Sequence, residues 1–386
     1  MRFMKIRMVL LGLLFAVFFQ NFVYAEELET IKIGVNLELT GKGKSYGISS
    51  LEGVQIAAAE YNAQGGFKGR KLELVVVDNQ SEESGSIIGM KKLVESRVVA
   101  VVGSAFSSPM IAAAPVNDES KVLGISGTAS NPRVTLDENG KVRPFLFTLS
   151  SNDWSQGAVM ATFATRSLKA QTAVIYIDNN SDYSKRVAIN FEKKFIQAGG
   201  IILSKERYQQ EDKNFKETLL KIKATKADVI FIPGYYQEVG LIIKQSRELG
   251  IKSFILGGDG WDAPSLSMIA GKENVENTFF CNDFSTKDTN PKVTKFVEEY
   301  RKKNGKEPDS FGALSYDATW LIINAMERAD STEPIKIRDE MENTKEYDGV
   351  TGRISIHTDH QAEKSIVVNI FRDGKPVFYE RVDLFQ

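Results

Sequence analysis

Short apolar runs that alternate with helical patterns constrain the fold of this chain more than any other feature. The apolar runs fall at 31–39, 71–78, 98–103, 122–126, 172–178, 227–234 and 252–259. They lack the in-out alternation of a half-exposed strand, which predicts strands buried on both faces within parallel sheets. Because the βαβα order occurs twice, we expect an α/β protein with two doubly wound parallel-sheet lobes.

Helical patterns separate these runs. They fall at 50–66, 85–96, 183–200, 215–226, 238–250, 291–304 and 311–329, and a further helix is expected from about Pro109. The length of 386 residues exceeds one ordinary domain and suits two lobes of about 150 residues each.

Two apolar stretches close the chain, at 352–357 and 365–377, and we expect them to pair with each other as strands. The sequence "RDGK" at 372–375 predicts a hairpin turn.

The first 25 residues have the organisation of a secretory signal peptide. A basic start, "MRFMKIR", precedes an apolar stretch of about a dozen residues, shorter than the roughly 20 that a membrane span needs. Small residues end the segment at Ala25, so the mature chain is expected to begin near Glu26. A membrane anchor is the alternative interpretation.

Composition narrows the classes of partner. The formal net charge is −1, which provides no global basic field for nucleic acid. Cys281 is the only cysteine, so an internal disulfide is impossible, and its apolar surroundings predict a buried core thiol.

Hydroxyl side chains follow two consecutive apolar runs. Ser107 and Ser108 open the expected helix with Pro109 in its first turn, and Ser130 lies in the loop after the next run. Free N–H groups at a helix start together with these hydroxyls would form a neutral receiver for a carboxylate. The alternative is that each serine is an ordinary helix cap.

A negative charge follows a strand in the second half of the chain. Asp259 lies in "FILGGDGWD" and, facing the first wall across a cleft, could pair with an ammonium group. A carboxylate receiver opposite an acid is the complement of an α-amino acid zwitterion. The alternative is a turn aspartate before glycine.

The residues give little support for catalysis. The two histidines, His357 and His360, lie near the C-terminal strand pair, and no G-x-S-x-G motif surrounds the serines. The "HTDH" segment falls short of the three or four convergent ligands of a firm metal site and is more typical of a solvated turn. No Walker A or dinucleotide-binding signature occurs, so we predict no cofactor, no metal and no enzymatic activity.

The mature chain resembles the periplasmic substrate-binding proteins of ABC transporters for branched-chain amino acids, also called extracellular ligand-binding receptors, which have the type I periplasmic binding fold. The resemblance lies in stretches that include "GISGTASNP" and "ILGGDGWDAP". The full set is 31–78, 98–116, 124–132, 227–250 and 255–271.

The resemblance implies a role for each candidate residue. Ser107 and Ser130 would hold the ligand carboxylate with neighbouring amides, and Ser108 and Ala129 beside them are also expected to be ligand-binding residues. Thr128 would offer its carbonyl to the ammonium, Asp259 would pair with it, and Tyr183 would support the same group. Aromatic residues would line the ligand side chain, with Trp261 narrowing the pocket; they are Tyr46, Tyr235, Trp261 and Tyr316. Relatives often have a glutamate at the place of Asp259, so the ligand could sit differently or differ in kind.

The resemblance also implies a hinge of three crossover segments, near 148–151, 281–285 and 356–362. The N-terminal lobe would comprise 26–148 plus 284–356, and the C-terminal lobe 149–283 plus 357–386. We expect a monomer in the periplasm that closes on an amino acid and is recognised by a membrane permease with its ATPase. The alternatives are a binder of a related small carboxylate, amide or urea-type ligand, and a chemosensory ligand-binding protein.

Overall fold

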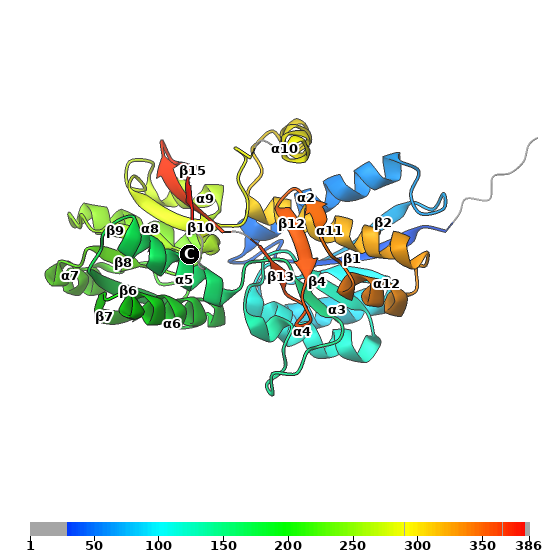
Figure 1. Cartoon of the computed structure of the whole chain (residues 1–386), viewed down its shortest axis with the longest axis horizontal. Helices are drawn as coiled ribbons and strands as arrows, with labels where there is room; N and C mark the ends of the chain where they lie inside the picture. Colours follow the sequence, from blue (N-terminus) through cyan, green and yellow to red (C-terminus); the bar gives the residue numbers. More distant parts are fainter. Residues whose placement is uncertain (1–28, 289, 365, 383–386) are drawn as a thin grey trace, which may run out of the picture.

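A computed structural model describes residues 29–288, 290–364 and 366–382 of the chain. Two lobes lie side by side along the long axis, each with a central sheet between layers of helices (Figure 1). The predicted α/β architecture of two doubly wound lobes is therefore confirmed. The expected signal peptide, 1–25, lies outside the described residues.

The first lobe contains a five-stranded sheet in the order β2-β1-β3-β4-β5, and all its neighbouring strands are parallel. The strands are β1 (Ile31–Leu37), β2 (Leu72–Asp78), β3 (Ala100–Val102), β4 (Leu123–Ser126) and β5 (Leu146–Thr148). One face packs on α2 (Lys44–Ala63), α11 (Ser310–Ala329) and α12 (Pro334–Glu342), and the other on α3 (Glu83–Glu95) and α4 (Ser107–Ser120). Ala100 and Val102 face the first layer and Val101 faces the second, which explains the continuous apolar run.

The second lobe contains a seven-stranded sheet in the order β15-β14-β10-β9-β8-β6-β7. Its strands are β6 (Thr172–Asp178), β7 (Ile201–Tyr208), β8 (Val229–Phe231), β9 (Phe254–Gly257), β10 (Thr278–Asn282), β14 (Val367–Arg372) and β15 (Lys375–Arg381). Helices α5 (Asp153–Arg166) and α6 (Asp182–Gln197) cover one face, and α7 (Lys216–Thr225), α8 (Tyr236–Glu248) and α9 (Pro264–Ala270) cover the other. The five strands from β6 to β10 are parallel, and β14 and β15 run antiparallel at one edge.

A small antiparallel sheet belongs to the first lobe. It consists of β11 (Tyr347–Gly349), β12 (Gly352–Ile356) and β13 (Ala362–Glu363), and α10 (Pro291–Asn304) packs nearby against α2. Asp317 of α11 fastens this sheet, because its carboxylate accepts hydrogen bonds from the amides of Val350 and Thr351 at 2.9 and 2.8 Å.

The C-terminal strands pair differently from the expectation. The hairpin at 372–375 is confirmed, with Asp373 and Gly374 both at positive φ as its tight turn requires. However, β12 does not pair with β14: β12 pairs with β11 and β13, whereas β14 pairs with β10 and β15. The prediction of one terminal pair was wrong because both stretches are apolar and sequence alone does not assign them to different lobes.

Three chain segments connect the lobes, between β5 and α5, between β10 and α10, and between β13 and β14 (Figure 1). The first two agree in position with the expected crossovers. The third lies a few residues later than 356–362, because Gln361 bridges to Thr148 and Ala362 pairs with Ile356 within the first lobe. Residues 357–363 therefore pack with the first lobe.

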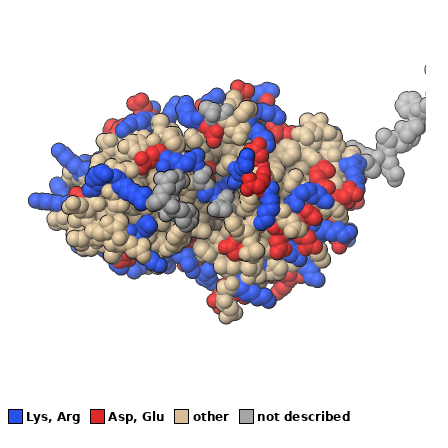
Figure 2. All heavy atoms as spheres, viewed as in Figure 1, with Lys and Arg blue, Asp and Glu red and all other residues tan. Residues whose placement is uncertain are grey.

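Lysine and arginine side chains are interspersed with aspartate and glutamate over the face in view (Figure 2). Among the described residues, no helix has the length and apolar character that crossing a bilayer requires. Cys281 is buried in the second lobe, as predicted, and burial raises the pKa of its thiol.

Candidate functional site

The first wall of the site is formed by the two loops that follow β3 and β4. Ser107 begins α4 and is buried, and its hydroxyl accepts a hydrogen bond from the amide of Asn131 at 3.3 Å. This bond joins the two loops that the sequence placed at neighbouring strand ends. Ser108 is half-buried beside it and Pro109 occupies the first turn of the helix.

A buried glutamate shapes this wall, and sequence reasoning did not identify it. Glu38 follows β1, and its carboxylate accepts hydrogen bonds from the amides of Ala105 and Phe106 at 3.0 and 3.3 Å and from the Ser104 hydroxyl. Burial raises the pKa of Glu38, while these bonds oppose the rise. Glu38 thus fixes the backbone that leads into Ser107.

The second loop of the wall has fewer free donors than expected. The hydroxyl of Ser126 accepts hydrogen bonds from the amides of Thr128 and Ala129, at 3.2 and 2.9 Å. Ser130 is buried, and its hydroxyl donates to Asp153 Oδ1 at 2.7 Å. The Ser130 hydroxyl, which the sequence analysis assigned to a ligand carboxylate, is therefore bonded to Asp153.

Asp153 begins α5 and was missed by the sequence analysis. Burial raises its pKa to about 8, and its second oxygen, Oδ2, is buried without a hydrogen-bond partner among the described residues. Its negative neighbour Asp259 adds to this rise, whereas the Ser130 hydroxyl lowers the pKa.

The second wall is formed around Asp259, in the short helical turn η2 (Asp259–Trp261) after β9. Asp259 Oδ2 accepts hydrogen bonds from Gln156 Nε2 at 2.8 Å and from the Ser150 hydroxyl at 3.2 Å. Burial, and then the negative charge of Asp283, raise the pKa of Asp259 to about 7. A carboxylate in this setting gains strongly from a cationic partner.

Tyr183 lies at the same corner. Its hydroxyl donates to Gln156 Oε1 at 3.2 Å and accepts from the amide of Gly260 at 3.5 Å. Gly258 permits this approach, since a Cβ atom there would lie 2.1 Å from the tyrosine oxygen.

Aromatic rings from both lobes meet between the walls. Tyr46, from the start of α2, is buried, and its hydroxyl donates to the carbonyl of Gly260 and accepts from the amide of Tyr236 at 3.0 Å. The ring of Tyr46 stacks on Phe311 with 4.3 Å between centroids. The centroid of the Tyr235 ring lies 4.4 Å from that of Phe106 and 5.5 Å from that of Tyr183. Phe106 and Phe311 were not predicted, because a lone phenylalanine in a sequence is typical of core.

Two predicted site residues lie elsewhere. The Trp261 side chain is fully buried in the second lobe, with its indole N–H donating to the carbonyl of Ile232 at 3.0 Å. Tyr316 lies on α11 and its hydroxyl donates to Glu60 at 2.6 Å, while its ring packs on Phe296. Among the described residues, neither the Trp261 nor the Tyr316 side chain forms a hydrogen bond with Asp259.

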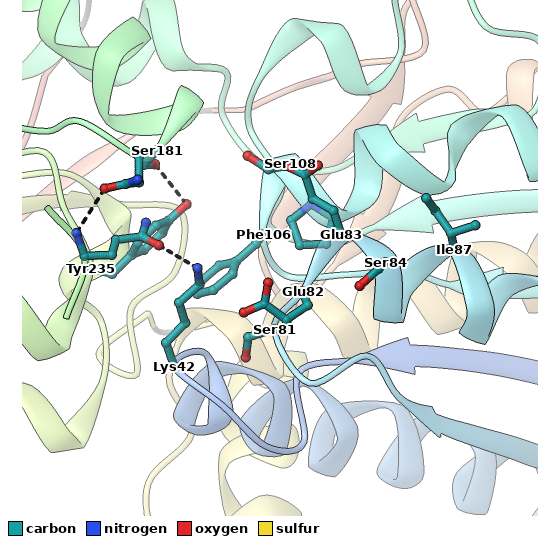
Figure 3. Close-up of a pocket in the computed structure, with 13 residues that line it drawn as sticks. Lys42, Ser81, Glu82, Glu83, Ser84, Ile87, Phe106, Ser108, Ser181 and Tyr235 are labelled. Atoms are coloured by element: carbon teal, nitrogen blue, oxygen red, sulfur yellow. Dashed lines mark hydrogen bonds between the residues drawn. The ribbon is translucent and has the colours of Figure 1, made fainter.

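A cavity of about 460 Å³ opens between the lobes beside these rings. Figure 3 shows Phe106 and Ser108 on its first-lobe side and Ser181 and Tyr235 on its second-lobe side. Its volume falls within the range of about 300–1,000 Å³ that is typical of small-molecule sites. The remaining lining is polar except for Pro109 and Ile87 and comprises Lys42, Ser81, Glu82, Glu83, Ser84, Asn180 and Gln210.

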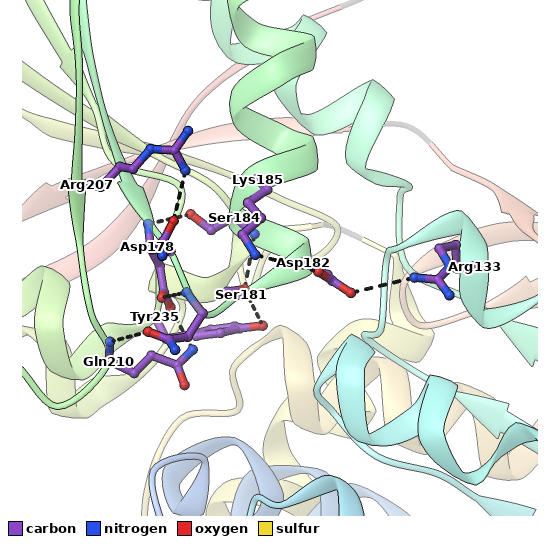
Figure 4. A network of polar contacts seen from close by, with 11 residues as sticks. Arg133, Asp178, Ser181, Asp182, Ser184, Lys185, Arg207, Gln210 and Tyr235 are labelled. Atoms are coloured by element: carbon purple, nitrogen blue, oxygen red, sulfur yellow. Dashed lines mark hydrogen bonds and ion pairs between the residues drawn. The ribbon is translucent and has the colours of Figure 1, made fainter. Parts of the chain in front are cut away.

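Polar contacts hold the lobes together at the rim of the cavity. Lys42 of the first lobe donates to Gln210 Oε1 of the second at 2.6 Å, and Gln210 Nε2 donates to Asp178 at 2.7 Å. Arg133 faces Asp182 across the gap at 3.9 Å (Figure 4). The structure is therefore a closed form of the two lobes.

The two histidines lie in the segment that packs on the first lobe, away from Asp259 and its neighbours. His360 is buried against Phe147, with 4.1 Å between ring centroids, and its Nδ1 lies 3.1 Å from the carbonyl of Leu146. The expectation of a solvated turn was wrong for His360, because the segment packs on the first lobe. The described residues contain no cluster of three potential metal ligands.

Comparison with known proteins agrees with this architecture. Residues 30–374 match the family described as periplasmic binding protein. The Leu/Ile/Val-binding protein homolog 2 of Brucella abortus is 28% identical over 327 residues, which cover 84% of this chain and 85% of that protein.

Two solved structures are similar over nearly the whole chain. They are the leucine binding protein LivK from Thermotoga maritima and the branched-chain amino acid transporter substrate binding protein LivJ from Streptococcus pneumoniae, the latter in complex with isoleucine. Each has a TM-score of 0.86 and 35% sequence identity, and the match covers 92% of this chain and 99% of the other. The chain belongs to the periplasmic binding protein family.

Proposed function

We propose that this protein binds an α-amino acid with an apolar, branched side chain between its lobes and presents it to the permease of an ABC importer. The observation that carries the proposal is the chain of neighbours that links the acid to the first-lobe hydroxyl: the charge of Asp259 acts on Asp153, and Asp153 accepts a hydrogen bond from Ser130 at 2.7 Å. The similarity to LivK and to the isoleucine complex of LivJ supports an apolar amino acid.

Each end of the zwitterion has a matching set of groups. The ligand carboxylate would take the Ser130 hydroxyl from Asp153 and bind beside Ser107 at the start of α4. The ammonium would bind Asp259, which Gln156 and Ser150 already orient. The apolar side chain would pack among the rings of Tyr46, Phe106 and Tyr235.

A role in transport requires partner proteins in addition to the ligand. We infer that a permease recognises the closed form, that an ATPase drives the transfer, and that the protein acts as a monomer in the periplasm after cleavage of residues 1–25. The inter-lobe bonds of Lys42 and Arg133 support a closed form with its own defined surface. No step of covalent chemistry is assigned to this chain.

A thermal-shift screen of the mature protein against the twenty amino acids tests the ligand class. Ligand binding to the native state adds RT ln(1 + [L]/Kd), which is about 2.7 kcal/mol at a hundredfold excess over Kd, so leucine, isoleucine or valine should raise Tm by several degrees. If no amino acid raises Tm but a plain carboxylate or an amide does, the ligand belongs to one of those two classes and is not an amino acid zwitterion.

A further inference from the structure

The sequence contains two Asn-Gly dipeptides, Asn139–Gly140 and Asn304–Gly305, and neither lines the cavity between the lobes. An asparagine before a glycine is chemically unstable wherever the glycine nitrogen can reach the carbonyl carbon of the asparagine side chain. Glycine eases this approach, because it has no Cβ atom and its backbone is permissive. The surroundings decide whether the approach occurs, and the two dipeptides have different surroundings.

Asn139–Gly140 lies in an exposed loop of the first lobe. Residues 137–141 form this loop between two residues that bridge each other as in a hairpin. Both Asn139 and Gly140 are exposed, and the Asn139 side chain forms no hydrogen bond within the described part of the chain. The Gly140 amide donates to the carbonyl of Asp137 at 3.1 Å, and its φ is +76°, so neither a helix nor a strand restrains this nitrogen. The two reacting groups and solvent water therefore meet in one turn.

Asn304–Gly305 lies at the end of α10 and is protected. The Gly305 amide closes the last turn of the helix by donating to the carbonyl of Arg301 at 2.8 Å. Asn304 is half-buried, and its side-chain nitrogen is shielded from solvent. The glycine nitrogen can reach the side-chain carbon here only when the helix end opens. The chain thus offers an exposed and a protected copy of the same dipeptide.

We propose that Asn139 is a site of spontaneous deamidation, which converts its neutral amide into a carboxylate. The Gly140 nitrogen bonds to Asn139 Cγ and loses its proton, the Cγ–Nδ2 bond breaks, and Nδ2 leaves as ammonia. The resulting succinimide ring takes up one water molecule at either carbonyl and opens to aspartate or isoaspartate. One water is consumed and one ammonia is released without any change of oxidation state, so solvent water is the only co-reactant.

The new carboxylate arises in a loop that already attracts a cation from the interface of the lobes. Glu138 Oε1, directly before Asn139, lies 3.6 Å from Arg133 Nη2, and Arg133 Nη1 lies 3.9 Å from Asp182 Oδ2 of the second lobe (Figure 4). A further negative charge in this loop attracts Arg133 and repels Asp182, and both effects oppose closure. Deamidation therefore weakens binding of the proposed amino acid as the protein ages, and this consequence rests on the proposed function.

Incubation of the mature protein in mildly alkaline heavy-oxygen water, followed by peptide mapping with mass spectrometry, tests the chemistry without any ligand. The peptide that contains Asn139 should gain the mass of an amide-to-acid change that includes one heavy oxygen atom. The peptide that contains Asn304 should react at least about fivefold more slowly, because the end of α10 must first open at the cost of about one net hydrogen bond. Asn139→Gln should remove the mass gain from the first peptide alone. Equal reaction of both peptides, or no reaction at Asn139, would overturn the proposed site.

Asn139→Asp reproduces the charge of the modified loop, and Asn304→Asp, the same substitution in the protected dipeptide, is its matched control. At low ionic strength Asn139→Asp should weaken isoleucine binding about two- to fivefold, the range of an exposed charge contact, and high salt should abolish the effect. Asn304→Asp should bind as the wild type does at both ionic strengths. An unchanged Kd for Asn139→Asp at low salt would overturn the link to closure. A protein that binds no amino acid would instead overturn the proposed function, and the mass measurement would still test the deamidation site.

Discussion

Ser130 and Asp153 form a hydrogen-bonded pair that satisfies one oxygen of the Asp153 carboxyl group. The serine hydroxyl bonds to Asp153 Oδ1, and the raised pKa of about 8 keeps the aspartate mostly protonated at pH 7. A neutral Asp153 does not repel an incoming ligand carboxylate, whereas an ionised one would. Asp153 and Asp259 are therefore expected to differ in function although the buried Asp153 and the half-buried Asp259 are neighbours.

Replacing each acid by its amide should separate these functions. Asp259→Asn removes the charge opposite the ammonium and should weaken isoleucine binding about 10- to 150-fold, the equivalent of about 1.5–3 kcal/mol for a charge-assisted bond. Asp153→Asn, the matched control, should change Kd less than about threefold at pH 7. Titration calorimetry measures both, and equal losses would show that the charge of Asp259 is not specifically required.

Stability should respond to Asp153 in a defined pH window. A folded pKa of about 8 lies above the ordinary value of about 3.9, so the folded protein holds a proton that the unfolded chain loses, and stability falls as pH rises from about 4 to 8. Asp153→Asn should therefore be more stable than the wild type at pH 8, with a gap that shrinks toward pH 5. Urea unfolding at the two pH values measures this gap; a gap independent of pH would contradict the raised pKa.

Among single residues of the site, the sequence analysis identified those that directly follow strands and missed those in or beside the segments that connect the lobes. Ser107, Ser130 and Asp259 stood out because hydroxyls or an acid directly followed apolar runs. Ser150, Gln156 and Asp283 lie near the hinge, where no periodic pattern fixes their position. The roles assigned to the predicted residues remain predictions until binding is measured.

At the scale of elements, loops after parallel strands position Ser130 and Asp259, whereas Gln156 and Tyr183 lie on helices α5 and α6. The "GGDGW" turn after β9 depends on two glycines that admit close neighbours: a Cβ on Gly257 would lie 2.0 Å from the Trp261 ring, and one on Gly258 would lie 2.1 Å from Tyr183 Oη. Trp261 thus anchors the turn from within the second lobe, whereas Asp259 projects to the cleft corner.

Gly258→Ala tests this role of the turn. The added methyl group must displace Tyr183, and with it the Gln156 contact that orients Asp259. We expect isoleucine affinity to fall at least tenfold, while the Tm of the protein changes by only a few degrees because the methyl group meets side-chain atoms of Tyr183 and Gln156 and not backbone. A collapse of Tm would show instead that the turn is essential to the core of the lobe.

The helices and strands that the sequence analysis predicted correctly were those with long apolar patterns. Residues 172–178 form β6 and residues 291–304 form α10, as expected. The strand β7 was not singled out, because exposed and half-buried residues alternate along it at the sheet edge. Helix α5 was also missed, since much of its buried face consists of small residues such as Ala158, Ala161 and Ala164.

At the scale of the whole molecule, closure joins the lobes through bonds that no single lobe can make. Tyr46 reaches from α2 to the backbone of Gly260 and Tyr236, and Lys42 reaches Gln210. These bonds exist only when the lobes are closed, so they favour the same state that the ligand favours.

Lys42→Met should weaken closure while it leaves the hydrogen bonds of Asp259 in place. Losing one hydrogen bond with a net value of about 1 kcal/mol corresponds to about fivefold weaker binding and to a larger radius of gyration in solution scattering without ligand. The exposed Lys44→Met is the matched control and should bind as the wild type does. Equal effects of both substitutions would argue for a general charge effect rather than a bond between lobes.

The most direct test of the account is the affinity of three related ligands for the wild-type protein. Isoleucine carries both charged ends, 3-methylpentanoic acid lacks the ammonium, and 2-methylbutylamine lacks the carboxylate. We predict that isoleucine binds at least a hundredfold more tightly than either analogue, because facing lobes hold opposite ends of the zwitterion. An analogue that binds as tightly as isoleucine would contradict this account.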